Sequence, residues 1–197
     1  MKKFFALLFA AFTCFAAQAG DLRATGMTMV DKGGFTLGIG VGTPGYGGAN
    51  KAVMPMITVD GQWGLASGFI NSKHFGNNGA VDLGFQYGIC GYNLWKEAGL
   101  KGGVMQNMVV LRSAFHYQFV KKLDTYAGFF GGCDISSPTG DWSDVQKDGW
   151  DHADSMFGMY WGGKWYFTDV FGAGIEFEDD FIRGNAPIVS AKVSFKF

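Results

Sequence analysis

The chain has 197 residues, a formal net charge of −1, 32 glycines and 17% aromatic residues. Only 17% of its residues are charged, against ~25% in an average globular protein. The balanced charge and the lack of a basic block argue against a nucleic-acid-binding protein. No segment after the N-terminal one approaches the ~18 consecutive apolar residues of a membrane helix. Beyond that segment the cysteines are Cys90 and Cys133, which are too few for a disulfide scaffold.

The N-terminal segment has the pattern of an export signal. Met1–Lys3 is basic, Phe4–Ala17 is apolar, and Ala17–Ala19 is a small-x-small sequence, which predicts a signal peptide over 1–19 that is cleaved after Ala19. An uncleaved anchor is the weaker interpretation, because the apolar run is shorter than the ~20 residues that span a bilayer as a helix. Cys14 is a poor lipoprotein signal, since Phe12 stands where a small residue is expected.

The rest of the chain alternates between apolar and polar residues with the period of a β-strand. Eight segments are predicted as strands, namely 34–42, 52–65, 81–90, 105–119, 123–134, 154–167, 170–178 and 188–197. Pro55 fits a strand only near its end or at a bulge, because proline cannot donate to the ladder. Two points stay open: 66–78 is a long turn or holds an extra short strand, and the two faces of 123–134 are hard to distinguish.

These strands predict an all-β fold, an eight-stranded antiparallel up-and-down transmembrane β-barrel over 34–197. A short periplasmic leader, 20–33, would precede it. An even strand number suits a bacterial barrel with both termini in the periplasm, where the turns are short and the outer loops long. The turns are expected at 120–123 and 167–169 and the outer loops at 43–51, 94–104, 135–153 and 179–186.

Three sequence segments and the C-terminus carry a family resemblance. The segments Gly33–Gly38, Leu123–Gly128 and Trp165–Asp169 resemble the outer-membrane β-barrel-domain family common in Bacteroidota, which is similar in architecture to OmpX and the OmpA barrel. A terminal phenylalanine on an amphipathic strand is the recognised ending of bacterial outer-membrane barrels. The resemblance implies that the last strand, with Phe195 and Phe197, is read by the insertion machinery and closes the barrel against the first strand.

The polar faces of the predicted strands collect charges of both signs. The residues are Asp60, Asp82, Arg112, His116, Lys164, Glu176, Glu178, Lys192 and Lys196. The bore of an eight-stranded barrel is just wide enough to be filled by side chains, and buried charges are tolerated when they are paired. We therefore expect an internal salt-bridge plug that includes the Glu176–Arg112 pair. The alternative is a selectivity-determining pore lining.

Aromatic residues divide into two groups. One group falls at periplasmic strand ends on the apolar face and predicts a membrane-interface girdle: Trp63, Tyr117, Phe119, Trp165, Phe167 and Phe197. Tyr46, Trp142 and Trp150 lie on predicted outer loops. Exposed aromatics there favour contact with a host protein or surface polymer, although stacking on neighbouring loops is the other interpretation.

The sequence contains only weak candidates for catalytic or metal-binding residues. Some small outer-membrane barrels modify lipid, and the best match here is His152 with Ser155 or Ser143. The aspartates of the 135–153 loop, Asp141, Asp144, Asp148 and Asp151, do not have the spacing of an EF-hand. We expect no cofactor, no metal and no enzyme activity. The sequence favours a barrel with a structural or surface-interaction role, then a narrow channel, then a lipid-modifying enzyme.

Overall fold

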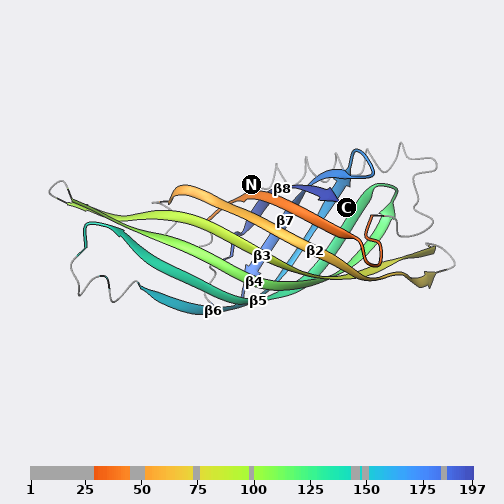
Figure 1. Ribbon diagram of the computed structural model, residues 1–197, viewed down its shortest axis with the longest axis horizontal. Helices are drawn as coiled ribbons and strands as arrows, with labels where there is room; N and C mark the ends of the chain where they lie inside the picture. The colour runs from red at the N-terminus through yellow and green to blue at the C-terminus, as the bar shows by residue number, and fades with distance from the viewer. Residues whose placement is uncertain are drawn as a thin grey trace, which may run out of the picture.

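Eight antiparallel strands close into one barrel in the computed structural model (Figure 1). The structure describes residues 29–44, 52–72, 76–97, 100–142, 147, 151–182 and 186–197. The strands are β1 (Phe35–Gly42), β2 (Ala52–Ser72), β3 (Gly76–Glu97), β4 (Leu100–Val120), β5 (Leu123–Gly140), β6 (His152–Tyr166), β7 (Phe171–Asp180) and β8 (Val189–Lys196). Each strand pairs with the next, and β8 pairs with β1. The predicted fold class is therefore confirmed, while the signal peptide and its cleavage site lie outside the described residues.

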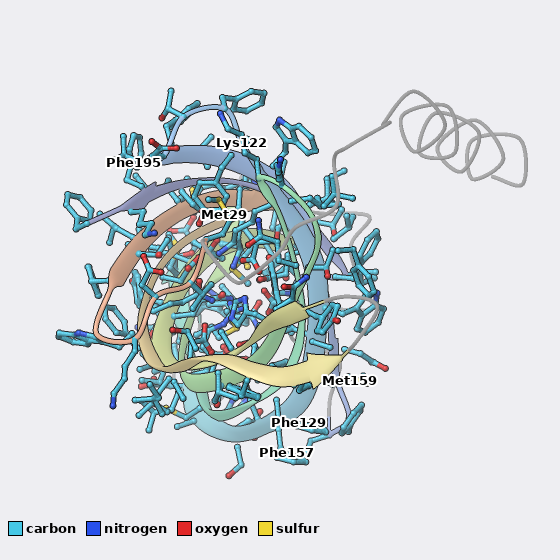
Figure 2. All side chains as sticks on the ribbon, turned by 90° about the vertical axis from the view of Figure 1, so that its right-hand side faces the viewer. Met29, Lys122, Phe129, Phe157, Met159 and Phe195 are labelled. Carbon is cyan, nitrogen blue, oxygen red and sulfur yellow. The ribbon has the colours of Figure 1, made fainter. Side chains whose placement is uncertain are left out.

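The wall of the barrel has apolar residues outside and polar residues inside. Leu111 is 68% exposed on the outer face, whereas the neighbouring Arg112 is 3% exposed and faces the bore. Figure 2, a view along the barrel, shows side chains filling the interior and Phe129, Phe157 and Phe195 projecting outward. Among the described residues, no helix is long and apolar enough to cross a bilayer. An apolar belt around a closed sheet is the pattern of a barrel that faces lipid.

The 66–78 stretch is neither the predicted long turn nor an extra strand. Instead β2 continues to Ser72 and β3 begins at Gly76. Their ladder changes register between Gly64 and Ala66 and again between Ser67 and Phe69. Each such bulge adds a residue and reverses which face the following side chains occupy. A strand prediction that requires unbroken alternation therefore stops at the first bulge.

Two predicted outer loops are also shorter than expected. Glu97 and Leu100 still pair, so β3 and β4 extend through most of the predicted 94–104 loop. β5 continues to Gly140, which pairs with Gly102 of β4. In Figure 1 the β3–β4 hairpin reaches beyond the other strands at one end of the barrel. Glycines at this end weakened the alternation, because a glycine contributes to neither an apolar nor a polar face.

The structure settles the open facing of β5. Tyr126 and Phe130 are buried in the bore, whereas Phe129 is exposed on the outside and stacks on Phe157 with ring centroids 6.3 Å apart. Pro55 lies where the β2–β3 ladder shifts register, between Met54 and Ile57, as its missing N–H requires.

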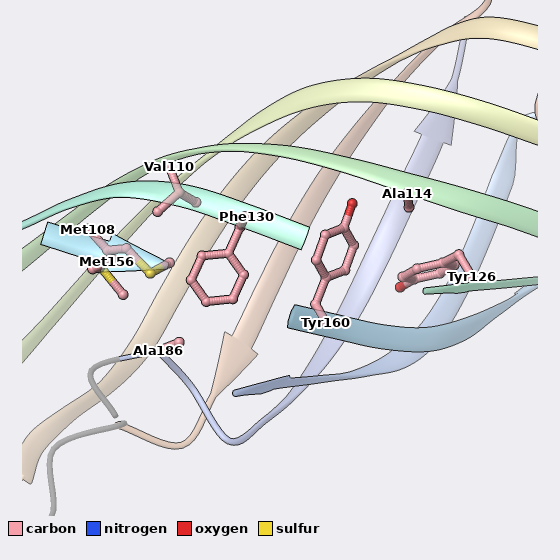
Figure 3. Close-up of a cluster of buried hydrophobic side chains, with 8 residues drawn as sticks. All are labelled: Met108, Val110, Ala114, Tyr126, Phe130, Met156, Tyr160 and Ala186. Carbon is pink, nitrogen blue, oxygen red and sulfur yellow. The ribbon is translucent and has the colours of Figure 1, made fainter. Parts of the chain in front are cut away.

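Part of the bore is filled by apolar side chains from the β4–β6 wall (Figure 3). The cluster consists of Met108, Val110, Ala114, Tyr126, Phe130, Met156, Tyr160 and Ala186. Ala186 comes from the connection between β7 and β8, so one residue of this connection belongs to the cluster. The charged side chains occupy the remaining interior.

Candidate functional site: the charged bore

The centre of the bore is an ion-pair cluster that links three strands. Arg112 on β4 donates from Nη2 to Oε2 of Glu176 on β7 over 2.6 Å. Lys192 on β8 lies with its Nζ 2.5 Å from the other oxygen, Oε1, of the same carboxylate. All three side chains are buried. The structure thus contains the Glu176–Arg112 pair expected from the sequence, with Lys192 as a second cation on Glu176.

Lys192 extends this cluster to β2 and β3. Its Nζ donates to Oδ1 of Asp60 over 3.0 Å and to Oε1 of Gln86 over 2.8 Å. The Gln86 amide nitrogen donates to Glu178 over 3.0 Å, and Arg112 Nη1 donates to the Gln86 oxygen. Gln86 therefore joins both cations to the second glutamate, a role that was not predicted. The sequence did place Gln86 on the inner face of a predicted strand, which was the one sign that it could join the charged cluster.

Glycines on β1 make room for these groups. A Cβ at Gly38 would lie 2.6 Å from both carboxylate oxygens of Asp60, and one at Gly40 would lie 2.8 Å from Cγ of Lys192. Real Cβ contacts are not that close, so larger residues on the inner face of β1 would push the ion pairs apart. The glycine-rich sequence of this strand therefore serves the charged cluster.

A second buried group surrounds His116 nearer the periplasmic end. Its Nε2 lies 3.0 Å from Oδ2 of Asp82, and its Nδ1 lies 2.9 Å from Oδ1 of Asp124. Asp82 also accepts from the backbone nitrogen of Ala114 over 2.7 Å. An imidazolium donates from both ring nitrogens, whereas a neutral imidazole donates from one. Asp124 was not among the predicted site residues. It is the second residue of β5, where the alternation between apolar and polar residues is not yet clear.

Lys164 and the bore tyrosines connect the charged and apolar parts of the interior. Lys164 donates to Oε1 of Gln62 over 2.8 Å and lies 5.0 Å from the ring centroid of Tyr126. The guanidinium of Arg112 lies 3.7 Å from the ring centroid of Tyr160. A cation over an aromatic face is attracted by the ring quadrupole, more strongly where water is excluded. Both tyrosines are buried site residues that were not predicted.

Lys196 lies apart from the central cluster. Its Nζ lies 2.6 Å from Oδ2 of Asp31, a residue that precedes β1 and is half exposed. Lys196 was expected in the internal network, but its position near the end of β8 brings it to the periplasmic mouth. The sequence places Asp31 in the predicted short periplasmic leader, 20–33, because that segment shows no sustained alternation.

The predicted lipid-modifying pair is not assembled on β6. His152 contacts Asp154 at 3.0 Å from Nε2 to Oδ2, while Ser155 is exposed and lies three positions after His152 on the same strand. Side chains an odd number apart on a strand face opposite sides. Ser143 lies outside the described residues. No group of histidine, cysteine or acidic side chains within the described ranges is arranged to hold a metal ion.

The two cysteines are free and separated by β4. Cys90 is buried in the bore, 3.1 Å from Oε1 of Gln106. Cys133 is a partly buried residue on β5, where it pairs with the lipid-facing Val109. The β-sheet wall therefore separates the two thiols.

Aromatic residues surround the periplasmic rim. Phe35 packs on Trp63 with centroids 5.0 Å apart, and Phe171 packs on Phe195 at 5.4 Å. Phe197 is 74% exposed, and its backbone nitrogen donates to the carbonyl of Phe35 over 2.8 Å. Tyr117, Phe119, Trp165 and Phe167 also lie at this end of their strands. The last residue thus completes the β1–β8 seam, on the lipid-facing side.

Of the aromatics expected on outer loops, Trp142 follows the end of β5. Its Nε1 donates to the carbonyl of Thr139 over 2.8 Å, which holds the indole against the β5 end. Tyr46 and Trp150 lie outside the described residues.

No family model and no curated protein matches the chain. Solved structures do. The N-terminal β-barrel domain of Pseudomonas aeruginosa OprF aligns over 84% of this chain and 98% of its own, with 15% identity and a TM-score of 0.49. Ail, the attachment invasion locus protein of Yersinia pestis, aligns over 84% and 99%, with 9% identity and a TM-score of 0.48. Neisserial surface protein A aligns over 84% and 98%, with 11% identity and a TM-score of 0.45.

The identities are too low to carry more than a likeness of fold, and the narrower resemblance to the Bacteroidota family stays a prediction. The distribution of apolar and polar residues over the barrel indicates what class of protein this is. A closed antiparallel sheet with an apolar exterior, an aromatic rim and a polar interior is built for lipid outside and not for water. The chain therefore forms a small β-barrel whose surface is built to span a membrane.

Proposed function

We propose that this barrel is a non-enzymatic, non-conducting protein with a structural or surface-interaction role. The observation that carries the proposal is the cluster of Arg112, Glu176 and Lys192, which joins β4, β7 and β8 across the bore. Together with the apolar cluster on the β4–β6 wall it occupies the interior. An eight-stranded barrel has little interior space beyond its own side chains.

An ion that crossed this bore would have to displace paired charges. Separating Arg112 from Glu176 leaves a buried charge without its partner, at a cost of several kcal/mol. A water-filled pore lining has the opposite character, because its charges are hydrated and exchange partners freely. The buried, multiply bonded state of Lys192 supports a plug.

The surface-interaction part rests on the projecting end of the barrel. β3, β4 and β5 pair with one another beyond the last pairs of β1, so they form a sheet that stands out from the wall (Figure 1). Trp142 lies at the end of β5, the outermost part of its ladder with β4. A projecting sheet with a partly exposed indole at its end suits contact with a host protein or a surface polysaccharide.

Planar-bilayer recording tests the plug. We expect the purified, folded barrel to give no large, steady conductance at neutral pH. Stable open channels whose ion selectivity changes in Arg112→Ala, with unchanged stability, would instead establish the narrow channel.

Binding arrays test the surface role. Folded barrel applied to immobilised extracellular-matrix proteins and bacterial polysaccharides should retain one class of ligand, and Trp142→Ala should weaken that binding. Trp161→Ala is the matched control, because Trp161 is a lipid-facing indole on β6. Equal binding of all three proteins would remove Trp142 from the proposed surface.

A further inference from the structure

The six residues before β1 pack into the periplasmic mouth of the bore. Met29 is buried in a cluster with Ala80 of β3 and Tyr166 of β6, and Val30 packs against this cluster. Figure 2 shows Met29 within the ring of strands. We call residues 29–34 the mouth segment. Its buried methionine anchors it within the barrel, although it is not part of the barrel wall.

Polar contacts fix the mouth segment to β2 and β8. The Gly33 nitrogen donates to the Gly64 carbonyl over 2.7 Å, and the Gly64 nitrogen donates to the Gly34 carbonyl over 3.0 Å. The Lys32 nitrogen donates to Oγ of Ser67 over 3.1 Å. The Asp31–Lys196 ion pair adds a link to the closing strand. Gly33 adopts φ +83°, the left-handed turn by which the chain reverses into the mouth.

Gly64 is what allows this close approach. A Cβ at this position would lie 2.0 Å from the carbonyl oxygen of Asp31 and 3.5 Å from Cγ1 of Val30. The first distance is a clash with backbone, so no side-chain rotation relieves it. The φ of Gly64 is not in the left-handed region. Alanine is therefore compatible with the β2 backbone and incompatible with the mouth segment as docked.

The mouth segment covers the carboxylates around His116. Met29, Val30 and Asp31 line a small pocket on one side, and its other walls include Asp82, Asp124 and Tyr166. Without the mouth segment this pocket would open to the periplasm. The bore below would then present two acidic side chains to water instead of a protein surface.

We propose that the periplasmic mouth is a docking site for the chain's own residues 29–34, and that the mouth segment is a removable cover over the Asp82–His116–Asp124 group. Undocking of the mouth segment leaves the barrel wall intact, because the ladder between β1 and β8 begins at Thr36, after this segment ends. One of the contacts that hold the cover, the Asp31–Lys196 ion pair, is partly in water, where such pairs contribute little. Segments held by few buried contacts open locally while the rest of a protein stays folded.

Thiol labelling at position 80 tests the cover. Ala80 is fully buried in the same cluster as Met29, so Ala80→Cys places a reporter against the mouth segment. Folded protein in detergent micelles is treated with a polar maleimide, and peptide mass spectrometry separates position 80 from Cys90 and Cys133. Adding Gly64→Ala should speed labelling about ten-fold or more, because the rate follows the open population.

Gly163→Ala is the matched control, since a Cβ there meets no atom closer than 3.7 Å; it should leave the rate unchanged. Heat-modified gel migration selects folded protein for every variant. Hydrogen exchange at the Gly33 amide, measured in chains that keep Ala80, avoids any effect of the reporter itself and should quicken in Gly64→Ala alone. Fast labelling when Gly64 is present, or equal labelling and equal Gly33 exchange in all chains, would overturn the proposal.

Discussion

Two lysines of β8, four residues apart and on the same inner face, form ion pairs of nearly equal length in different surroundings. Lys192 lies 2.5 Å from Glu176, with both side chains 1% exposed. Lys196 lies 2.6 Å from Asp31, with side chains 17% and 52% exposed. Coulomb attraction is screened by water at the mouth and much less in the bore. Burial, rather than the distance between charges, therefore decides how much each pair matters for the fold.

The largest effect is expected from Arg112→Ala. It leaves the buried Glu176 carboxylate with one cation fewer and removes the guanidinium from Tyr160. Breaking a buried pair by deleting one partner costs ~3–5 kcal/mol. Urea unfolding followed by tryptophan fluorescence should show this loss in the free energy of unfolding. Lys122→Ala, in an exposed turn, is the control, and a loss no larger than the control's would show that the bore pairs are hydrated.

The two lysines themselves give the sharpest contrast. Lys192→Met should cost ~3 kcal/mol, because Glu176 and Asp60 lose a buried partner. Lys196→Met should cost ~0–1 kcal/mol, the range for pairs exposed to water. The same urea titration compares both variants with wild type. Equal losses would contradict the assignment of one pair to the bore and the other to the mouth.

A smaller effect is expected when the space around the buried cluster is reduced. Gly38→Ala brings a methyl group to 2.6 Å from the Asp60 carboxylate. Overpacking of this kind costs ~1–3 kcal/mol. The control is Gly131→Ala, where a Cβ has its nearest contact at 3.7 Å. If both variants unfold at the same urea concentration, the inner face of β1 is not tightly packed.

Deleting Phe197 tests the seam at the other end of β8. The deletion removes an exposed aromatic and the backbone bond to Phe35, and leaves the central ion pairs in place. We expect less folded barrel in the outer membrane, seen as a weaker heat-modifiable band on a gel. Wild-type yield from the shortened chain would argue against Phe197 as an assembly signal.

The comparison also shows what sequence reasoning can reach. Period-two alternation placed Arg112, Glu176 and Lys192 on inner faces, because in a regular strand facing follows from parity alone. It missed the continuation of β2 past Leu65, since bulges reverse parity. Asp31 lies in a segment without any period, and its contact with Lys196 depends on a turn at Gly33. Gln86 was placed correctly, but its bonding required knowledge of which strands face each other across the bore.

The measurement that tests the central claim most directly is a double-mutant cycle on Arg112 and Glu176. Arg112→Met, Glu176→Gln and the double variant are unfolded in urea beside wild type. For a buried contact in a shared network we predict a coupling energy of ~2–3 kcal/mol, with the double variant less destabilised than the sum of the single changes. A coupling energy near zero, with additive losses, would mean that water separates the two side chains and that the bore is not plugged by them.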